Sequence, residues 1–111
     1  MSKKQSISEL TNLLTKSLRH KIGAAVNENE FYASKYSKDY EIIFKQAEKV
    51  AVKNFWSSED KKEIKEQLNK KLKKELTQKI FINNKKFNIM DEEINSALKK
   101  LSLYIYENLF V

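Results

Sequence analysis

The feature that most limits how this chain can fold is the near absence of the two residues that make turns. Its 111 residues include no proline and one glycine, Gly23. Sheet proteins need many tight turns, and such turns use glycine and proline. Long helices joined by short polar loops are therefore expected, and the length is typical of one domain with a single core. We predict an all-α fold, a compact bundle of about four helices, forming one domain over residues 1–111.

Apolar residues recur every three or four positions in four segments, which is the spacing of one helix face. The predicted helices cover approximately residues 7–26, 29–55, 59–82 and 92–110. Ser6 with Glu9 has the spacing of a capping box before the first helix, and Ser57 with Asp60 has it before the third. A short β-hairpin at 80–89 is the alternative to a third helix that runs into a loop.

Two details of these helices concern packing. Gly23 lies in the last turn of the first helix, where it either frays the end or lets another helix approach closely. The apolar stripe of the second helix ends at Phe55, so that residue is expected in the core, and Trp56 beside it is expected to close the edge of the bundle.

Residues suited to catalysis are scarce in this chain. There is no cysteine, and His20 is the only histidine, expected on the surface between Arg19 and Lys21. A histidine metal cluster or an ordinary catalytic triad cannot be assembled from one histidine, and one glycine does not make a phosphate loop. We predict that the chain is not an enzyme, with no cofactor, no metal site and no small-molecule substrate.

No stretch approaches the roughly 20 consecutive apolar residues that a membrane-spanning helix requires. The start of the chain, Met1-Ser2-Lys3-Lys4, leads into no signal-peptide apolar region. We expect no membrane partner and a cytoplasmic location.

The formal net charge of +7 is concentrated in one part of the chain. Residues 61–86 hold ten basic and three acidic side chains. A strip of lysines can neutralise nucleic-acid phosphates without reading the bases. The leading hypothesis is therefore an accessory protein that binds DNA, RNA or a ribonucleoprotein without sequence specificity. The candidate nucleic-acid-binding residues are Lys61, Lys62, Lys65, Lys70, Lys71, Lys73, Lys74, Lys79, Lys85 and Lys86.

Two other interpretations stay open. The lysines could be the solvated face of a helix at the edge of the bundle, and biased codon usage could account for their number, since arginine occurs once. The fourth helix also carries more apolar residues than one buried face needs. It is the candidate interface of a protein-interaction module, with a second copy or another subunit as partner, through Leu103, Tyr104, Tyr106, Leu109, Phe110 and Val111.

Overall fold

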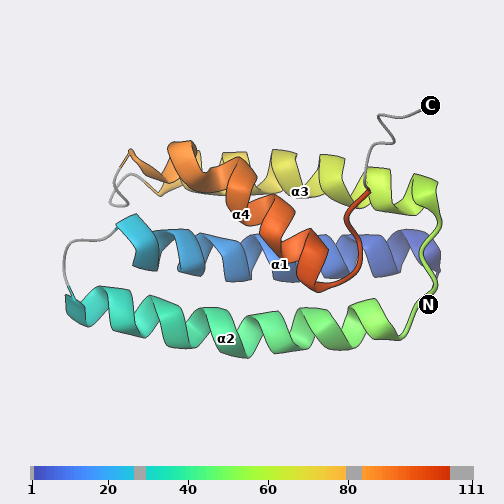
Figure 1. Ribbon diagram of the computed structural model, residues 1–111, viewed down its shortest axis with the longest axis horizontal. Coiled ribbons are helices and arrows are strands. Elements are labelled where there is room, and N and C mark those ends of the chain that lie inside the picture. The colour runs from blue at the N-terminus through green and yellow to red at the C-terminus, as the bar shows by residue number, and fades with distance from the viewer. Residues whose placement is uncertain (1, 27–29, 80–83, 106–111) are drawn as a thin grey trace.

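The computed structural model describes residues 2–26, 30–79 and 84–105 (Figure 1). These residues form four α-helices: α1 (Lys3–Val26), α2 (Glu30–Val52), α3 (Ser58–Gln78) and α4 (Lys86–Lys100). There is no strand in the described ranges. The predicted all-α bundle of four helices is therefore confirmed.

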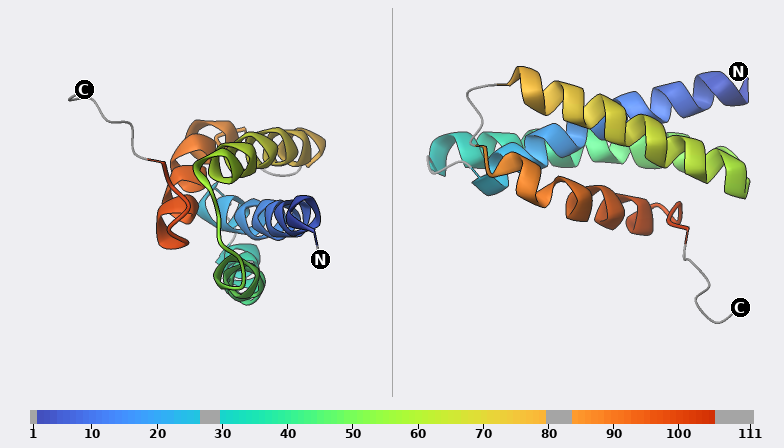
Figure 2. Two further views of the ribbon diagram at one scale, coloured as in Figure 1. Left: turned by 90° about the vertical axis from the view of Figure 1, so that its right-hand side faces the viewer. Right: turned by 90° about the horizontal axis from the view of Figure 1, so that it is seen from above.

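The helices are arranged around α1, and each runs antiparallel to the one before it (Figure 1). The helices α2 and α3 lie on opposite sides of α1, and α4 packs against both α1 and α3 (Figure 2). The buried leucines and isoleucines of α1 and α3 form the centre of the core, joined by Ile94, Ala97 and Leu98 of α4. Among the described residues, no helix is long and apolar enough to cross a membrane.

Of the two capping boxes predicted at helix starts, one is confirmed and the other is wrong. Before α3, the Ser57 hydroxyl accepts from the Asp60 N–H (3.1 Å) and the Asp60 carboxylate accepts from the Ser57 N–H (2.9 Å), so the predicted capping box is confirmed. The hydrogen bond from the Ser57 backbone is the main cause that lowers the pKa of Asp60. Before α1, the cap is Ser2 with Gln5 and not Ser6 with Glu9. Ser6 is buried one turn inside the helix.

The helix α4 lies further towards the N-terminus than the sequence predicted. It begins at Lys86, not near residue 92, and its first turn is closed by hydrogen bonds from Phe87 and Asn88 to the carbonyls of Asn84 and Lys85. Residues 86–89 are helical, so the hairpin at 80–89 is wrong for that part, and residues 80–83 lie outside the described residues. The Lys86 ammonium donates to the Lys79 carbonyl (2.8 Å), and this tertiary contact fixes the start of α4.

The end of α4 is a Schellman motif, in which the residue after the cap adopts the left-handed conformation. Ser102 has φ 58, and the Leu103 N–H donates to the Leu98 carbonyl (2.7 Å) while the Ser102 N–H donates to that of Lys99 (3.2 Å). This turn sends Leu103 back into the core, where it is buried. The predicted extension of the helix to residue 110 is therefore wrong, because α4 stops at Lys100.

Substitutions at Ser102 test this helix end. A side chain in the left-handed region costs roughly 1–2 kcal/mol, a cost that glycine does not carry. We expect Ser102→Gly to raise the free energy of unfolding by about 0.5–1 kcal/mol and Ser102→Val to lower it by about 1–2 kcal/mol. Urea denaturation at equal m values measures both changes. Shifts of the same sign for the two variants would contradict the motif.

Gly23 marks a close helix contact, which was one of its two predicted roles. A Cβ built on Gly23 would lie 2.9 Å from Cδ2 of Tyr36 in α2, closer than carbon atoms normally approach. The ring of Tyr36 therefore occupies the space that a side chain would take. In this way α2 and α1 come together near the end of α1.

The neighbours Phe55 and Trp56 have opposite environments. Trp56 is 9% exposed, and its indole N–H donates to the Ala51 carbonyl (2.9 Å), so it closes the end of the bundle as predicted. Phe55 is 86% exposed, so its predicted place in the core is wrong. The helix α2 ends at Val52, and the helical period that placed Phe55 on the core face no longer applies beyond that residue.

Candidate nucleic-acid interface

The positive charge of α3 lies in the C-terminal half of that helix. Residues 58–66 contain three lysines and four acidic residues, whereas residues 67–79 contain five lysines and Glu75 as the single acid. Lys70, Lys73 and Lys74 are exposed and lie within one turn of each other. Together they form a shallow hollow with Thr77 and Gln78.

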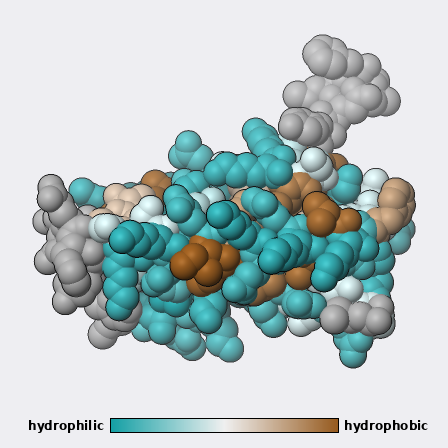
Figure 3. Space-filling view, turned by 90° about the horizontal axis from the view of Figure 1, so that it is seen from below, coloured by the Kyte–Doolittle hydropathy of each residue, from teal (hydrophilic) through white to brown (hydrophobic). Residues whose placement is uncertain are grey.

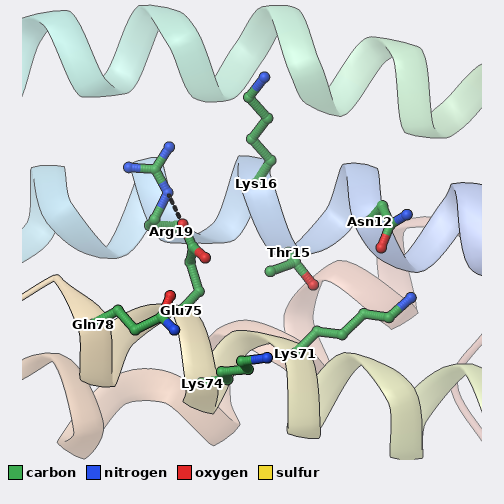
Figure 4. Close-up of a pocket in the computed structure, with 8 residues that line it drawn as sticks. All are labelled: Asn12, Thr15, Lys16, Arg19, Lys71, Lys74, Glu75 and Gln78. Carbon is green, nitrogen blue, oxygen red and sulfur yellow. Dashed lines mark ion pairs between the residues drawn. The ribbon is translucent and has the colours of Figure 1, made fainter.

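A second group of cations joins this half of α3 from α1. A groove of about 480 Å³ runs between the two helices. Figure 4 shows the side chains that line it: Asn12, Thr15, Lys16, Arg19, Lys71, Lys74, Glu75 and Gln78. Lys16 and Arg19 come from α1, about 55 residues away in sequence from the lysines that they join. We call Lys16, Arg19, Lys70, Lys71, Lys73 and Lys74 the basic face.

Lys71 is the most constrained lysine of the basic face. It is partly buried, and its ammonium donates to the hydroxyl of Thr11 in α1 (2.6 Å). Burial of the ammonium lowers the pKa of Lys71 from its ordinary value, because a less hydrated site disfavours the charged form. An anion bound in the groove would reverse this effect, since an opposite charge favours the protonated ammonium.

The one acid of the groove is already paired. The Glu75 carboxylate lies 3.3 Å from Nε of Arg19 and 3.7 Å from Nζ of Lys79. Arg19 therefore links α1 to α3 through its Nε, while a terminal nitrogen of its guanidinium lies 3.5 Å from Nε2 of His20. The Lys79 ammonium is engaged at the edge of the same cluster.

The other lysines predicted for nucleic-acid binding lie elsewhere. Lys61, Lys62 and Lys65 line a separate hollow with Leu98, Leu103 and Ile105, next to the acidic residues of the first half of α3. Lys85 is exposed in the turn before α4.

Lys86 is the clearest correction among the predicted binding residues. It is 2% exposed, and its ammonium donates to the carbonyl at the C-terminal end of α3. Its position makes it a structural residue between α3 and α4. We therefore leave it out of the basic face.

The predicted protein interface is only partly within the described residues. Leu103 is buried in the core of its own chain, and the ring of Tyr104 is partly buried beneath the ammonium groups of Lys65 and Lys99, so neither forms an open apolar surface. Tyr106, Leu109, Phe110 and Val111 lie outside the described residues. Seen from the side of α2, the surface is mostly hydrophilic with small, separate apolar areas (Figure 3).

His20 is buried, so its predicted surface position is wrong. Its Nδ1 lies 2.7 Å from the Lys16 carbonyl, and its ring meets that of Tyr36 edge-on at 5.8 Å between centroids. His20 thus fills the contact between α1 and α2. No group of three or more histidine, aspartate or glutamate side chains suited to holding a metal occurs in the described part of the chain.

The lysines of α3 were predicted from the sequence, but Lys16, Arg19 and Thr15 were not. The charge count could not find them, because it took residues 1–60 together, where eight acids nearly balance ten basic side chains, although α1 by itself has five basic side chains and one acid. Only the packing of α1 beside α3 brings these residues to the same groove. We find no match to this chain among protein-family models, curated protein sequences or solved structures.

Proposed function

We propose that this chain is a non-enzymatic protein that binds the phosphate backbone of nucleic acid through its basic face, without sequence specificity. The observation that carries this proposal is the gathering of cations from two helices. Four of them, Lys16, Arg19, Lys71 and Lys74, line a groove whose single acid is paired with Arg19, and Lys70 and Lys73 lie in the adjoining hollow of α3. Each phosphate that such a surface neutralises releases condensed counterions, so affinity falls as salt concentration rises.

The residue types support backbone binding rather than base readout. Five of the six cations are lysines, which act as compact point charges on flexible stems. Bidentate contacts to guanine favour arginine, and the only arginine, Arg19, is engaged with Glu75. Binding through these residues is therefore expected to depend on charge and salt, with little preference among sequences.

The distribution of charge also favours a binding surface over simple solvation. In the first half of α3 lysines and acids are interspersed, which keeps a helix soluble without mutual repulsion. On the basic face six like charges lie close together, an arrangement that repels itself but attracts polyanions. A lysine excess produced by codon usage alone would not concentrate on two facing helices.

Charge reversal tests the proposal. We expect the triple substitution of Lys70, Lys73 and Lys74 by glutamate to weaken binding of a mixed-sequence 20-nucleotide DNA or RNA by at least about 100-fold at low salt, since each neutralised phosphate contact contributes to the salt-dependent affinity. Fluorescence anisotropy at two salt concentrations measures both the affinity and its salt slope. Lys71 stays unchanged because it contacts Thr11, and its reversal would also disturb the fold.

The matched control reverses three exposed lysines of the second helix and its end, Lys45, Lys49 and Lys53. This control changes net charge by the same amount but lies on α2, which packs on the opposite side of α1 from α3 (Figure 1). We expect it to weaken binding by less than about tenfold, through the general field of the protein. Equal effects of the two triple variants, or wild-type binding that does not fall with salt, would overturn the proposal.

A further inference from the structure

One buried polar atom lies in the groove of the basic face without a partner. Thr15 is 9% exposed, and its hydroxyl oxygen makes no hydrogen bond to any described residue. Its side chain points from α1 towards α3, on the side of the groove where Lys71 and Lys74 lie (Figure 4). A buried hydroxyl normally finds a partner, because leaving it unpaired costs free energy.

Other threonines in this chain show what Thr15 lacks. Within a helix, a threonine hydroxyl commonly donates to the carbonyl four residues earlier. The hydroxyl of Thr11 does so to Ile7 (2.8 Å), and that of Thr77 does so to Lys73 (2.7 Å). The Thr15 hydroxyl faces the groove and forgoes this bond. It is thus a donor that a ligand in the groove could use.

We infer that the groove between α1 and α3 holds one phosphate group, with the Thr15 hydroxyl donating to a phosphate oxygen and Lys71 and Lys74 neutralising its charge. A phosphate group could come from nucleic acid or from a small molecule, and both would bind through the same contacts. The choice of a nucleic-acid phosphate rests on the proposed function. Hydrogen bonds from charged donors to phosphate are the stronger kind, and a hydroxyl adds direction to them.

The groove suits an anion that replaces water around partly buried cations. The Lys71 ammonium is already partly desolvated and donates to the neutral hydroxyl of Thr11, so a phosphate would supply a counter-charge to it. The oxygen of Thr15 is less than 1 Å² exposed, so a phosphate reaches it only when long side chains at the groove move aside. Lys74 is exposed and can make that movement.

The first test uses inorganic pyrophosphate and the full chain, followed by amide chemical shifts in NMR. We expect saturable shifts around residues 15–19 and 71–75. Thr15→Val keeps the shape of the side chain and removes its hydroxyl, and should weaken pyrophosphate binding about tenfold. Thr77→Val is the matched control, because that hydroxyl lies on the same face but donates to its own helix; it should change affinity less than twofold. Shifts spread evenly over lysines of all four helices, or equal effects of the two variants, would overturn the inference.

The second test identifies the source of the phosphate by adding the 20-nucleotide probe. Reversal of the pyrophosphate shifts by the oligonucleotide, with weaker oligonucleotide binding by Thr15→Val, supports a nucleic-acid phosphate. If pyrophosphate binding depends on Thr15 but no oligonucleotide binds, the phosphate site is supported and the proposed function is wrong. If oligonucleotide binding is unchanged in Thr15→Val but requires Lys70, Lys73 and Lys74, the proposed function is supported and the phosphate site is wrong.

Discussion

Replacement of Trp56 by alanine is expected to lower the free energy of unfolding by about 3–5 kcal/mol, the range typical of a buried aromatic residue. Trp56 lies where α2 ends and α3 begins, and it belongs to the core. The loss has three parts: the buried indole surface, the hydrogen bond from its N–H to Ala51, and the contact with the Lys3 ammonium, 4.8 Å from the ring centre. Chemical denaturation followed by far-ultraviolet circular dichroism measures it.

The adjacent residue provides the control for Trp56. Phe55 is an aromatic residue in the same connection but is 86% exposed, so Phe55→Ala should change the free energy of unfolding by less than about 0.5 kcal/mol. Lys3 also donates to the Phe55 backbone carbonyl, a contact that the alanine substitution leaves in place. Similar losses for the two variants would show that Trp56 does not hold this end of the bundle.

Replacement of Lys86 by glutamate is expected to lower the free energy of unfolding by about 3 kcal/mol, because it puts an unpaired charge in a buried position. The carboxylate would face the Lys79 carbonyl, which lies at the negative end of the α3 dipole. An acid at the start of α4 gains only about 0.3–1 kcal/mol from the dipole of that helix. The unfavourable contact is therefore the larger effect.

Two further variants separate burial from charge at this position. Lys73→Glu makes the same change on an exposed residue and should alter stability by less than about 0.5 kcal/mol. Lys86→Met keeps the buried stem and removes the ammonium. It should lower the free energy of unfolding by less than half as much as Lys86→Glu does. If Lys86→Glu and Lys73→Glu are equally stable, Lys86 does not join α3 to α4 and belongs among the surface lysines after all.

The candidate site was predictable in part. Lys70, Lys71, Lys73 and Lys74 were found because residues close together on one helix keep their relative positions in any fold. The groove itself was not predictable, since it needs Thr15, Lys16 and Arg19 from a helix about 55 residues earlier. The role of Lys86 was also hidden, because burial of a lysine is decided by the tertiary contact to Lys79 and not by its neighbours in sequence.

By itself, the sequence determined the helical class, four helices and the buried stripes of α1 and α3, because apolar spacing and the absence of turn residues act locally. Tertiary structure decided where helices stop and what surrounds them. Ser2 rather than Ser6 caps α1, Ser102 ends α4 so that Leu103 can return to the core, and α1 becomes the central helix. The physical reason is one of magnitude. Losing a helix cap or leaving a polar group without its partner costs only about 1–3 kcal/mol, and the free energy gained by packing the core is larger.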